Sequence, residues 1–340
     1  MKRIKRAGML WIIIFMLGFC KSVQAADSQA DDIIKRTTEV MNNVKVIGVD
    51  VIVGETTLME MRADKNTNIT YMSMSDGNES IKMWMDQKNK MMYIYSQGKY
   101  YFQPLSDGDL KAGDDVSVGI DSTLSFSYMG EEQYRNIQCY KLQAIQKDAV
   151  PCIYYIEKNT YRIIAVIIEG KDNVVTSYYF YPESVTVPEE AKQKATLAEG
   201  YCVTKNKITY QCQYVKGKPV LYAVSAKEAK GALKIADCVK ICGQQYQVYG
   251  IDDNAFRGNK KITSAVVGKN VRSIGKNAFY GCKKLKTVRI NSSKLTKIGA
   301  KAFYGNAKKL KFKVPKKKAS KYKKLINKSK TKSKVTYSQI

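Results

Sequence analysis

The feature that most constrains this chain is a short motif written three times near its C-terminus. "IGKNAFYGC" begins at Ile274, "IGAKAFYGN" begins at Ile298, and a weaker copy, "IDDNAFRGN", begins at Ile251. The phenylalanines of the three copies lie 23 and 24 residues apart, at Phe256, Phe279 and Phe303. A period in this range is typical of stacked repeats, because one unit cannot bury its apolar face alone and neighbouring copies bury it together.

Apolar residues recur at fixed places in the middle copy, and lysines separate them. We expect the apolar positions to point into a shared core while the lysines stay in water. The expected core positions are Ile274, Ala278, Phe279, Leu285, Val288 and Ile290.

The stretch "SIGKNAFYGCKKLKTVRI" combines Ile-Gly-x-x-Ala-Phe with a following Cys, a Leu and a short strand-like run. It resembles a BspA-type leucine-rich repeat, and the resemblance covers roughly residues 233 to 315. It implies a short leucine-rich-repeat solenoid, in a family whose repeats serve binding at bacterial surfaces. Cys282 falls where that family often has a buried cysteine, so we interpret it as a packed small side chain rather than a nucleophile.

The N-terminus predicts export. A basic start is followed by an apolar run from Ala7 to Cys20 and a small-residue site ending at Ala25, which together are typical of a secretory signal peptide over residues 1–26. A lipid anchor on Cys20 is the alternative, but the bulky Phe19 precedes it where that processing prefers a small residue. No later run is apolar enough to span a bilayer. We therefore predict a protein that is secreted or held at the cell surface.

Residues 27–191 read as one helix followed by many strands, which predicts an α+β domain. "DSQADDIIKRTTEVMNNV" has apolar residues at helical spacing, whereas "TTLMEMRA", "NITYMSMS" and "SIKMWMDQ" alternate with a period of two. The alternation places paired methionines on one face of successive strands: Met59, Met61, Met72, Met74, Met83, Met85 and Met92. These residues either pack as plain core under the helix or line a groove for an acyl chain or lipid.

The segments "NIQCYKLQAI", "CIYYIEKNTYRIIAVIIEG" and "YYFYPESVTVPEEA" close this half of the chain. With the preceding helix and strands they resemble the lipoprotein-carrier-like (LolA/LppX-like) domains of secreted Gram-positive proteins. The resemblance implies an incomplete antiparallel barrel with a helix and a hydrophobic cavity that accepts lipid or lipid anchors in relatives.

The remaining segments are assigned by their composition. Residues 192–200 are polar, end in a glycine and are predicted to be a linker. Residues 201–232 alternate like a β-hairpin that caps the repeats of residues 233–325. Residues 326–340 are predicted to form a basic tail that frays after a short capping helix.

The positive charge belongs to the repeats. The whole chain carries +28, and residues 251–340 hold 27 lysines and arginines against two acidic residues, Asp252 and Asp253. A cell-wall polyanion and lineage-wide lysine usage each explain this run, and a surface protein is a further possible partner; export argues against nucleic acid. Because lysines bind polyanions as point charges, we predict that such a polymer contacts Lys308, Lys309, Lys311, Lys313, Lys316, Lys317 and Lys318.

Seven of the eight cysteines follow the predicted signal, so at least one thiol is left unpaired. Cys139 and Cys152 flank a plausible hairpin and are predicted to form a disulfide, and Cys202 with Cys212 is a weaker pair. "DCVKIC" lacks a second cysteine pair at finger spacing, so no structural metal is predicted there.

The chain contains no histidine, which removes the usual general base and the Ser-His-Asp and Cys-His arrangements. The loop "SDGDLKAGDD" offers Asp107, Asp109, Asp114 and Asp115 but lacks the spacing of a known calcium loop, and a solvated loop is the simpler interpretation. No cofactor motif is found. We therefore predict a non-enzymatic binding protein that acts either through its basic repeats or as a lipid or lipoprotein carrier through its methionine-lined domain.

Overall fold

The computed structural model of the protein describes residues 28–75, 79–105, 124–145, 150–170 and 173–340. The predicted signal peptide and the aspartate-rich loop at 106–115 lie outside these ranges. The chain is rich in strands and divides into two compact units, Met1–Ala195 (unit 1) and Thr196–Ile340 (unit 2). None of the helices in these ranges is both long and apolar enough to cross a membrane.

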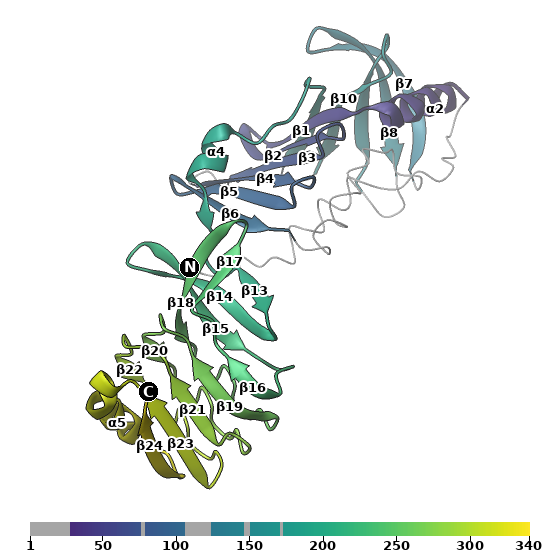
Figure 1. Ribbon diagram of the computed structural model, residues 1–340. Helices are drawn as coiled ribbons and strands as arrows, with labels where there is room; N and C mark the ends of the chain where they lie inside the picture. The colour runs from purple at the N-terminus through teal and green to yellow at the C-terminus, as the bar shows by residue number, and fades with distance from the viewer. Residues whose placement is uncertain (1–27, 76–78, 106–123, 146–149, 171–172) are drawn as a thin grey trace. The chain divides into compact units, whose positions relative to one another are not determined.

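Unit 1 is dominated by an antiparallel sheet in the strand order β6-β5-β4-β3-β2-β1-β11-β10-β9-β8-β7 (Figure 1). Long runs of alternating residues joined by short turns form such a sheet from neighbouring strands. Its strands are β1 (Val46–Val53), β2 (Thr56–Asp64), β3 (Ile69–Ser75), β4 (Ser80–Asp86), β5 (Met91–Ser96), β6 (Lys99–Pro104), β7 (Ser125–Tyr134), β8 (Ile137–Ile145), β9 (Cys152–Glu157), β10 (Ile163–Glu169) and β11 (Val174–Phe180).

Two helices pack against this sheet. Helix α2 (Ser28–Asn43) buries Ile33, Ile34 and Met41 in a cluster that contains sheet residues such as Phe126. Its apolar residues recur at helical spacing. The negative charge of Asp31 in the first turn interacts favourably with the positive N-terminal end of the helix dipole and stabilises the helix.

Helix α4 (Glu189–Lys194) begins directly after Pro188, whose fixed φ suits a helix start. Its Ala191 is fully buried and packs with Val187 and Trp84. The boundary between the two units falls within residues 192–200, the predicted linker, but this segment is not irregular throughout: residues 192–194 are helical, and Thr196–Leu197 form strand β12. The sequence did not predict this helix, because Ala191 is its only buried residue and its other residues are polar.

After the two-residue strand β12, unit 2 continues with three antiparallel strands: β13 (Cys202–Lys205), β14 (Ile208–Val215) and β15 (Lys218–Ser225). Ile208, Tyr210 and Cys212 alternate with more exposed residues along β14 and are buried. The pairing then changes to parallel, because β15 pairs with β18 (Gln244–Ile251). Strand β17 (Cys238–Ile241) is added to β18 in antiparallel fashion.

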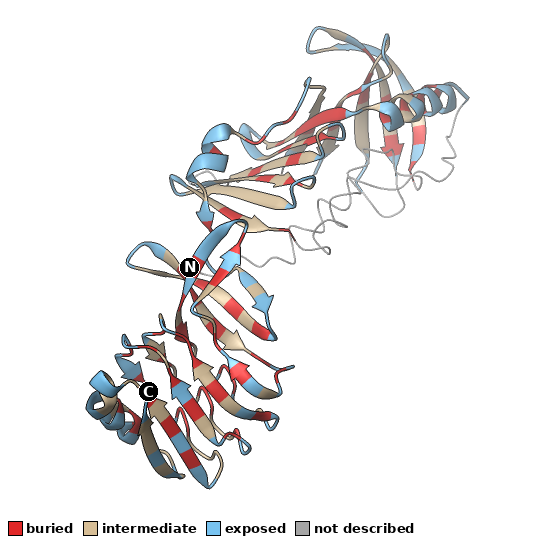
Figure 2. Cartoon of the chain, viewed as in Figure 1, coloured by how far each residue is buried: buried red, intermediate tan, exposed pale blue. Residues whose placement is uncertain are grey.

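The repeats form two ladders of parallel strands. One continues from β18 to β20 (Ser273–Ile274) and β22 (Lys297–Ile298). The other contains β16 (Gly231–Lys234), β19 (Ile262–Val267), β21 (Thr287–Ile290), β23 (Lys309–Val314) and β24 (Lys334–Gln339). Buried and exposed residues alternate along these strands (Figure 2). All six predicted core positions of the middle copy are fully buried.

The glycine in each "IG" pair lets successive repeats approach closely. A Cβ on Gly275 would lie 2.5 Å from backbone atoms of Asp252 and Asp253, and one on Gly299 would lie 2.4 Å from the amide nitrogen of Lys276. Backbone atoms cannot move aside cheaply, so the repeat spacing requires glycine at these two positions.

The C-terminal end of unit 2 is ordered, which corrects the predicted fraying of residues 326–340. After the 3-10 turn η1 (Lys316–Lys318), helix α5 (Ala319–Lys328) buries Tyr322 and Ile326. The Tyr322 hydroxyl donates to the Ser292 carbonyl oxygen at 2.9 Å. Strand β24 then pairs in parallel with β23 from Lys309–Lys334 to Val314–Gln339. The tail prediction rested on Lys328, Lys330, Lys332 and Lys334 and missed the strand that begins at Lys334 and pairs with β23 along one edge.

Candidate functional sites

The seven predicted methionines lie on one face of the unit 1 sheet. Met61 stands opposite Met72, which stands opposite Met83, while Met59 faces Met74 and Met85 faces Met92. Side chains that are directly opposite on neighbouring strands share a face. The structure therefore brings together residues from four strands, β2 to β5.

These methionines differ in burial. Met61 is 6% exposed and packs with Val49 and Val51, whereas the other six are only half-buried. We call the half-buried set the methionine face: Met59, Met72, Met74, Met83, Met85 and Met92. Flexible thioether side chains that are half-covered form an adaptable apolar surface.

Three of the predicted lysines form the centre of a positively charged surface on unit 2. Lys309, Lys311 and Lys313 alternate along β23 with the buried residues Leu310 and Phe312, so all three project from the outer side. Across the ladder, Lys313 is paired with Arg289 and Lys309 is paired with Lys334. We call these five residues the basic sheet face. Sequence reasoning missed Arg289 and Lys334, because their register with β23 is a property of the fold.

The other predicted lysines lie near the ends of the same strand. Lys308 is exposed directly before β23, and Lys316, Lys317 and Lys318 form the turn η1 directly after Pro315. They are therefore close in sequence to the basic sheet face but are not part of its ladder.

The basic sheet face has no acidic neighbours to neutralise it. Residues 196–340, which the structure describes throughout, contain no ion pair, whereas lysines and arginines of unit 1 pair with carboxylates, as Lys141 does with Glu132 at 2.7 Å. Unit 2 therefore carries its positive charge without internal ion pairs.

The predicted Cys139–Cys152 disulfide is absent, and both thiols are free. In the β8–β9 hairpin Cys139 stands opposite Glu157, and Cys152 stands opposite Ala144. The two cysteines are thus separated by about five residues along the strands, roughly 16 Å. A disulfide requires α-carbons within about 7 Å, so this register excludes the bridge. The hairpin exists as expected, but the cysteines lie at its opposite ends.

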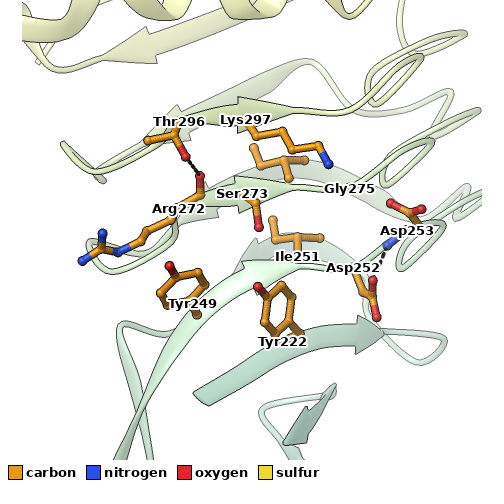
Figure 3. A pocket seen from close by; sticks show the side chains of 11 residues that line it. Tyr222, Tyr249, Ile251, Asp252, Asp253, Arg272, Ser273, Gly275, Thr296 and Lys297 are labelled. Carbon is orange, nitrogen blue, oxygen red and sulfur yellow. Dashed lines mark hydrogen bonds between the residues drawn. The ribbon is translucent and has the colours of Figure 1, made fainter. Parts of the chain in front are cut away.

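A hollow of about 350 Å³ on unit 2 was not anticipated from the sequence (Figure 3). It is lined by residues of β15, β18, β20 and β22. We call it the tyrosine hollow and define it by Tyr222, Tyr249, Asp252, Arg272, Ser273 and Lys297.

The floor of the hollow depends on a glycine. Tyr222, Gly250, Ser273 and Lys297 form one row across the four strands. A Cβ on Gly250 would lie 2.3 Å from the Tyr222 ring, so the ring occupies the space that a side chain would take. Tyr249 lies beside it with ring centroids 6.0 Å apart.

Charged groups surround the two rings. The Arg272 guanidinium lies 5.3 Å from the centre of the Tyr249 ring. The Asp252 carboxylate accepts hydrogen bonds from the Gln213 side-chain amide at 3.2 Å and from the Asp253 backbone amide at 2.8 Å. Burial raises the pKa of the Tyr222 phenol above its ordinary value.

The repeat pattern contains one signal for this hollow. Asp252 occupies the place that Gly275 and Gly299 hold in the next two copies. At those glycines a side chain would collide with the preceding copy. The copy at Ile251 follows β15 of the hairpin instead, and there an aspartate side chain fits and reaches the hollow (Figure 3).

The structure offers no metal centre in the parts it describes, where no three histidine, cysteine or acidic side chains gather.

Comparison with known proteins agrees with the repeat architecture. Residues 246–339 match the family described as "BspA type Leucine rich repeat region" in six copies. The match begins within β18 and includes β24, so it also covers most of the segment predicted as a tail. No curated protein matches the chain.

Solved structures that resemble parts of the chain include two mycobacterial proteins and a leucine-rich cell surface protein. Lipoprotein LppX of Mycobacterium tuberculosis is 11% identical over 48% of this chain and 100% of its own, with a TM-score of 0.38. LprF of Mycobacterium bovis is 13% identical over 49% and 99%, with a TM-score of 0.37. A leucine-rich cell surface protein of Faecalibacterium prausnitzii A2-165 is 22% identical, with a TM-score of 0.28, over 34% of this chain and only 36% of that protein.

Proposed function

We propose that this protein is an exported, non-enzymatic binding protein of the bacterial cell surface whose basic sheet face holds an anionic cell-wall polymer. The observation that carries the proposal is the ladder of Arg289, Lys309, Lys311, Lys313 and Lys334, in a unit that contains no ion pair.

The spacing of this ladder supports a repeating anionic partner. Side chains on one face of a strand emerge about 7 Å apart, and neighbouring strands lie about 5 Å apart. Two like charges about 5 Å apart repel by about 0.8 kcal/mol even in bulk water. These spacings are shorter than the screening length of about 8 Å at physiological ionic strength, so salt removes only part of the repulsion. A flexible polyanion would relieve it along the whole ladder.

The finer fold belongs to the same proposal. We take unit 2 to be a short solenoid, which is supported by parallel, in-register pairing from β16 to β24. We take unit 1 to be an incomplete antiparallel barrel with a helix. This is supported by its sheet, in which antiparallel pairing continues without a break from the edge strand β6, through β1 and β11, to the other edge strand β7.

The test compares two variants of the mature chain that lose the same charge. One carries Lys309→Ser, Lys311→Ser and Lys313→Ser; the control carries Lys65→Ser, Lys88→Ser and Lys99→Ser, three exposed lysines of unit 1. Each is sedimented with purified teichoic-acid-containing cell wall at increasing salt. We expect wild type and control to bind alike and to release as salt rises.

The β23 variant should bind weakly at low salt. Loss of three contacts should lower the slope of log affinity against log salt by about two to three, by analogy with nucleic-acid polyanions. Equal losses in both variants would indicate a response to net charge alone and contradict a site. Retention in molar salt would point instead to a protein partner.

A second function is favoured by the methionine face, namely binding of an acyl chain or lipid by unit 1. Six half-buried methionines on one face of β2 to β5 form an apolar surface of adaptable shape. Titration of the full chain with an environment-sensitive fatty-acid probe tests this function. We expect a fluorescence increase that Met72→Asp with Met83→Asp abolishes and that Met129→Asp, at a 51% exposed position on β7, leaves unchanged. No response to several acyl probes would leave the methionines as plain core.

A further inference from the structure

The tyrosine hollow has no role in the functions proposed above. It belongs to the β15-β18-β20-β22 ladder, whereas the basic sheet face belongs to the ladder that contains β21, β23 and β24. Its shape is held by interactions within unit 2 alone. It therefore needs its own explanation.

The hollow offers stacking surfaces rather than a purely apolar cavity. Tyr222 and Tyr249 are half-buried, and their rings are inclined by 41°. Figure 3 shows the two rings side by side beneath Ser273, with Arg272 beyond Tyr249 and the two aspartates beyond Tyr222. A ring-shaped ligand resting on the tyrosines would have polar groups within reach at both ends.

Those polar groups remain available for a ligand. Asp252 uses its carboxylate for two internal hydrogen bonds, and Asp253 accepts the Lys276 amide at 2.6 Å through one oxygen. A carboxylate offers about four lone-pair positions, so both retain acceptor capacity. The charged ends of Arg272 and Lys297 make no ion pair within residues 196–340.

We propose that the tyrosine hollow binds a sugar ring of an oligosaccharide. The apolar C–H face of a pyranose stacks on aromatic rings, while its edge hydroxyls both donate and accept hydrogen bonds. Tyr222 and Tyr249 supply the stacking surface, Asp252 and Asp253 the acceptors, and Arg272 and Lys297 the donors. An acyl chain would leave these charged groups unpaired and desolvated. A ligand of one charge sign would meet like charge at one end of the hollow.

The altered repeat supports this assignment. If the first copy served only to stack on its neighbouring copies, we would expect glycine at position 252, as at the equivalent positions Gly275 and Gly299. The aspartate instead adds a charged group, and the Gln213 amide holds that group in place at 3.2 Å. Gly250 likewise gives up a side chain so that the Tyr222 ring can lie in the row. The aspartate at position 252 and the glycine at position 250 thus both shape the tyrosine hollow.

The experiment titrates the full mature chain with the neutral tetrasaccharides chitotetraose, cellotetraose and mannotetraose by isothermal calorimetry. We expect at least one to bind, and Tyr222→Ala to weaken that binding by at least about tenfold, the loss of roughly 1.4 kcal/mol. Asp252→Gly restores the repeat pattern and should also weaken it while leaving thermal stability near that of wild type. Tyr280→Ala, at a half-buried tyrosine elsewhere in unit 2, and Lys311→Ser are the controls and should bind as wild type does.

The proposal is overturned if none of the three tetrasaccharides binds at about 10 mM, a concentration that detects even millimolar affinity. It is also overturned if Tyr222→Ala and Asp252→Gly bind as wild type does, because the sugar would then lie elsewhere. Equal weakening by Lys311→Ser would assign the oligosaccharide to the basic sheet face.

Discussion

The rings of Phe279 and Phe303 stack with their centroids 5.3 Å apart and their planes inclined by only 11°. Phe256 extends the column, with its centroid 4.9 Å from that of Phe279. All three side chains are at most 2% exposed. The repeat period thus brings the same side chain to the same place in successive copies, and the middle ring contacts both neighbours.

Because Phe279 is central, Phe279→Ala should be the most damaging of the three alanine substitutions. Removing a buried phenylalanine costs about 3–5 kcal/mol of unfolding free energy. Chemical denaturation followed by far-UV circular dichroism measures this loss. Trp84 is the only tryptophan after residue 27 and reports on unit 1, so its fluorescence transition should stay unchanged. If the Trp84 fluorescence transition shifts as much as the circular dichroism transition, the two units do not unfold independently.

Gly275→Ala should destabilise unit 2 by about 1–3 kcal/mol, the usual cost of overpacking. The new methyl group would lie 2.5 Å from the backbone of the preceding copy. Gly299→Ala meets a similar obstacle at 2.4 Å and should behave alike. Lys276→Ala, at an exposed position of the same turn, is the control and should change stability by less than about 0.5 kcal/mol. Unfolding free energies indistinguishable among all three variants would mean that the copies tolerate a wider spacing.

The repeats and the methionine pattern could be predicted because they depend on local periodicity. The spacing of Phe256, Phe279 and Phe303 fixes which side chains stack, and alternation along a strand fixes which face Met72 and Met83 share. Neither inference needs to know which distant segments meet.

The features that escaped prediction depend on register or on distant pairing. Cys139 and Cys152 are close in sequence, but the turn length decides that they stand apart. Tyr222 reaches the hollow only because β15 pairs in parallel with β18, whose residues lie more than 20 positions further on. Strand β24 is held by backbone hydrogen bonds to β23, a distant pairing that its own six residues do not reveal.

Asp64 should make unit 1 sensitive to acid. Burial alone would raise the pKa of this 3% exposed carboxyl, but the amides of Val185, Asn66 and Thr67 donate to it and hold the pKa below its ordinary value. Its stabilising contribution is therefore complete above pH 4 and is lost as the pH falls through the lowered pKa. Asp64→Asn should cost about 1–3 kcal/mol at neutral pH.

The difference between wild type and Asp64→Asn should shrink as the pH falls below about 4, the ordinary pKa of an aspartate. Urea denaturation followed by Trp84 fluorescence measures it across that range. Glu169→Gln, at an exposed position of β10, is the control and should leave stability unchanged. A loss for Asp64→Asn that is constant down to pH 2 would show that the amides do not favour the charged form.

Cys282 should make unit 2 sensitive to alkali. Its thiol is fully buried and donates to the Phe256 carbonyl oxygen at 3.1 Å, and burial raises its pKa to about 12 from an ordinary value near 9. A thiol that ionises near pH 9 when unfolded and near 12 when folded contributes stability that is complete below pH 9 and is lost between these values, by up to about 1.4 kcal/mol per pH unit. Cys282→Ala lacks this dependence, while Cys212 and the tyrosines titrate in both proteins and cancel in the comparison. The stability advantage of wild type over Cys282→Ala should therefore decline between pH 9 and 11.

In native protein at pH 8, iodoacetamide should modify the exposed Cys202 and spare Cys282. Modification of both at the same rate, or Cys282 found in a disulfide, would contradict its place in the repeat core.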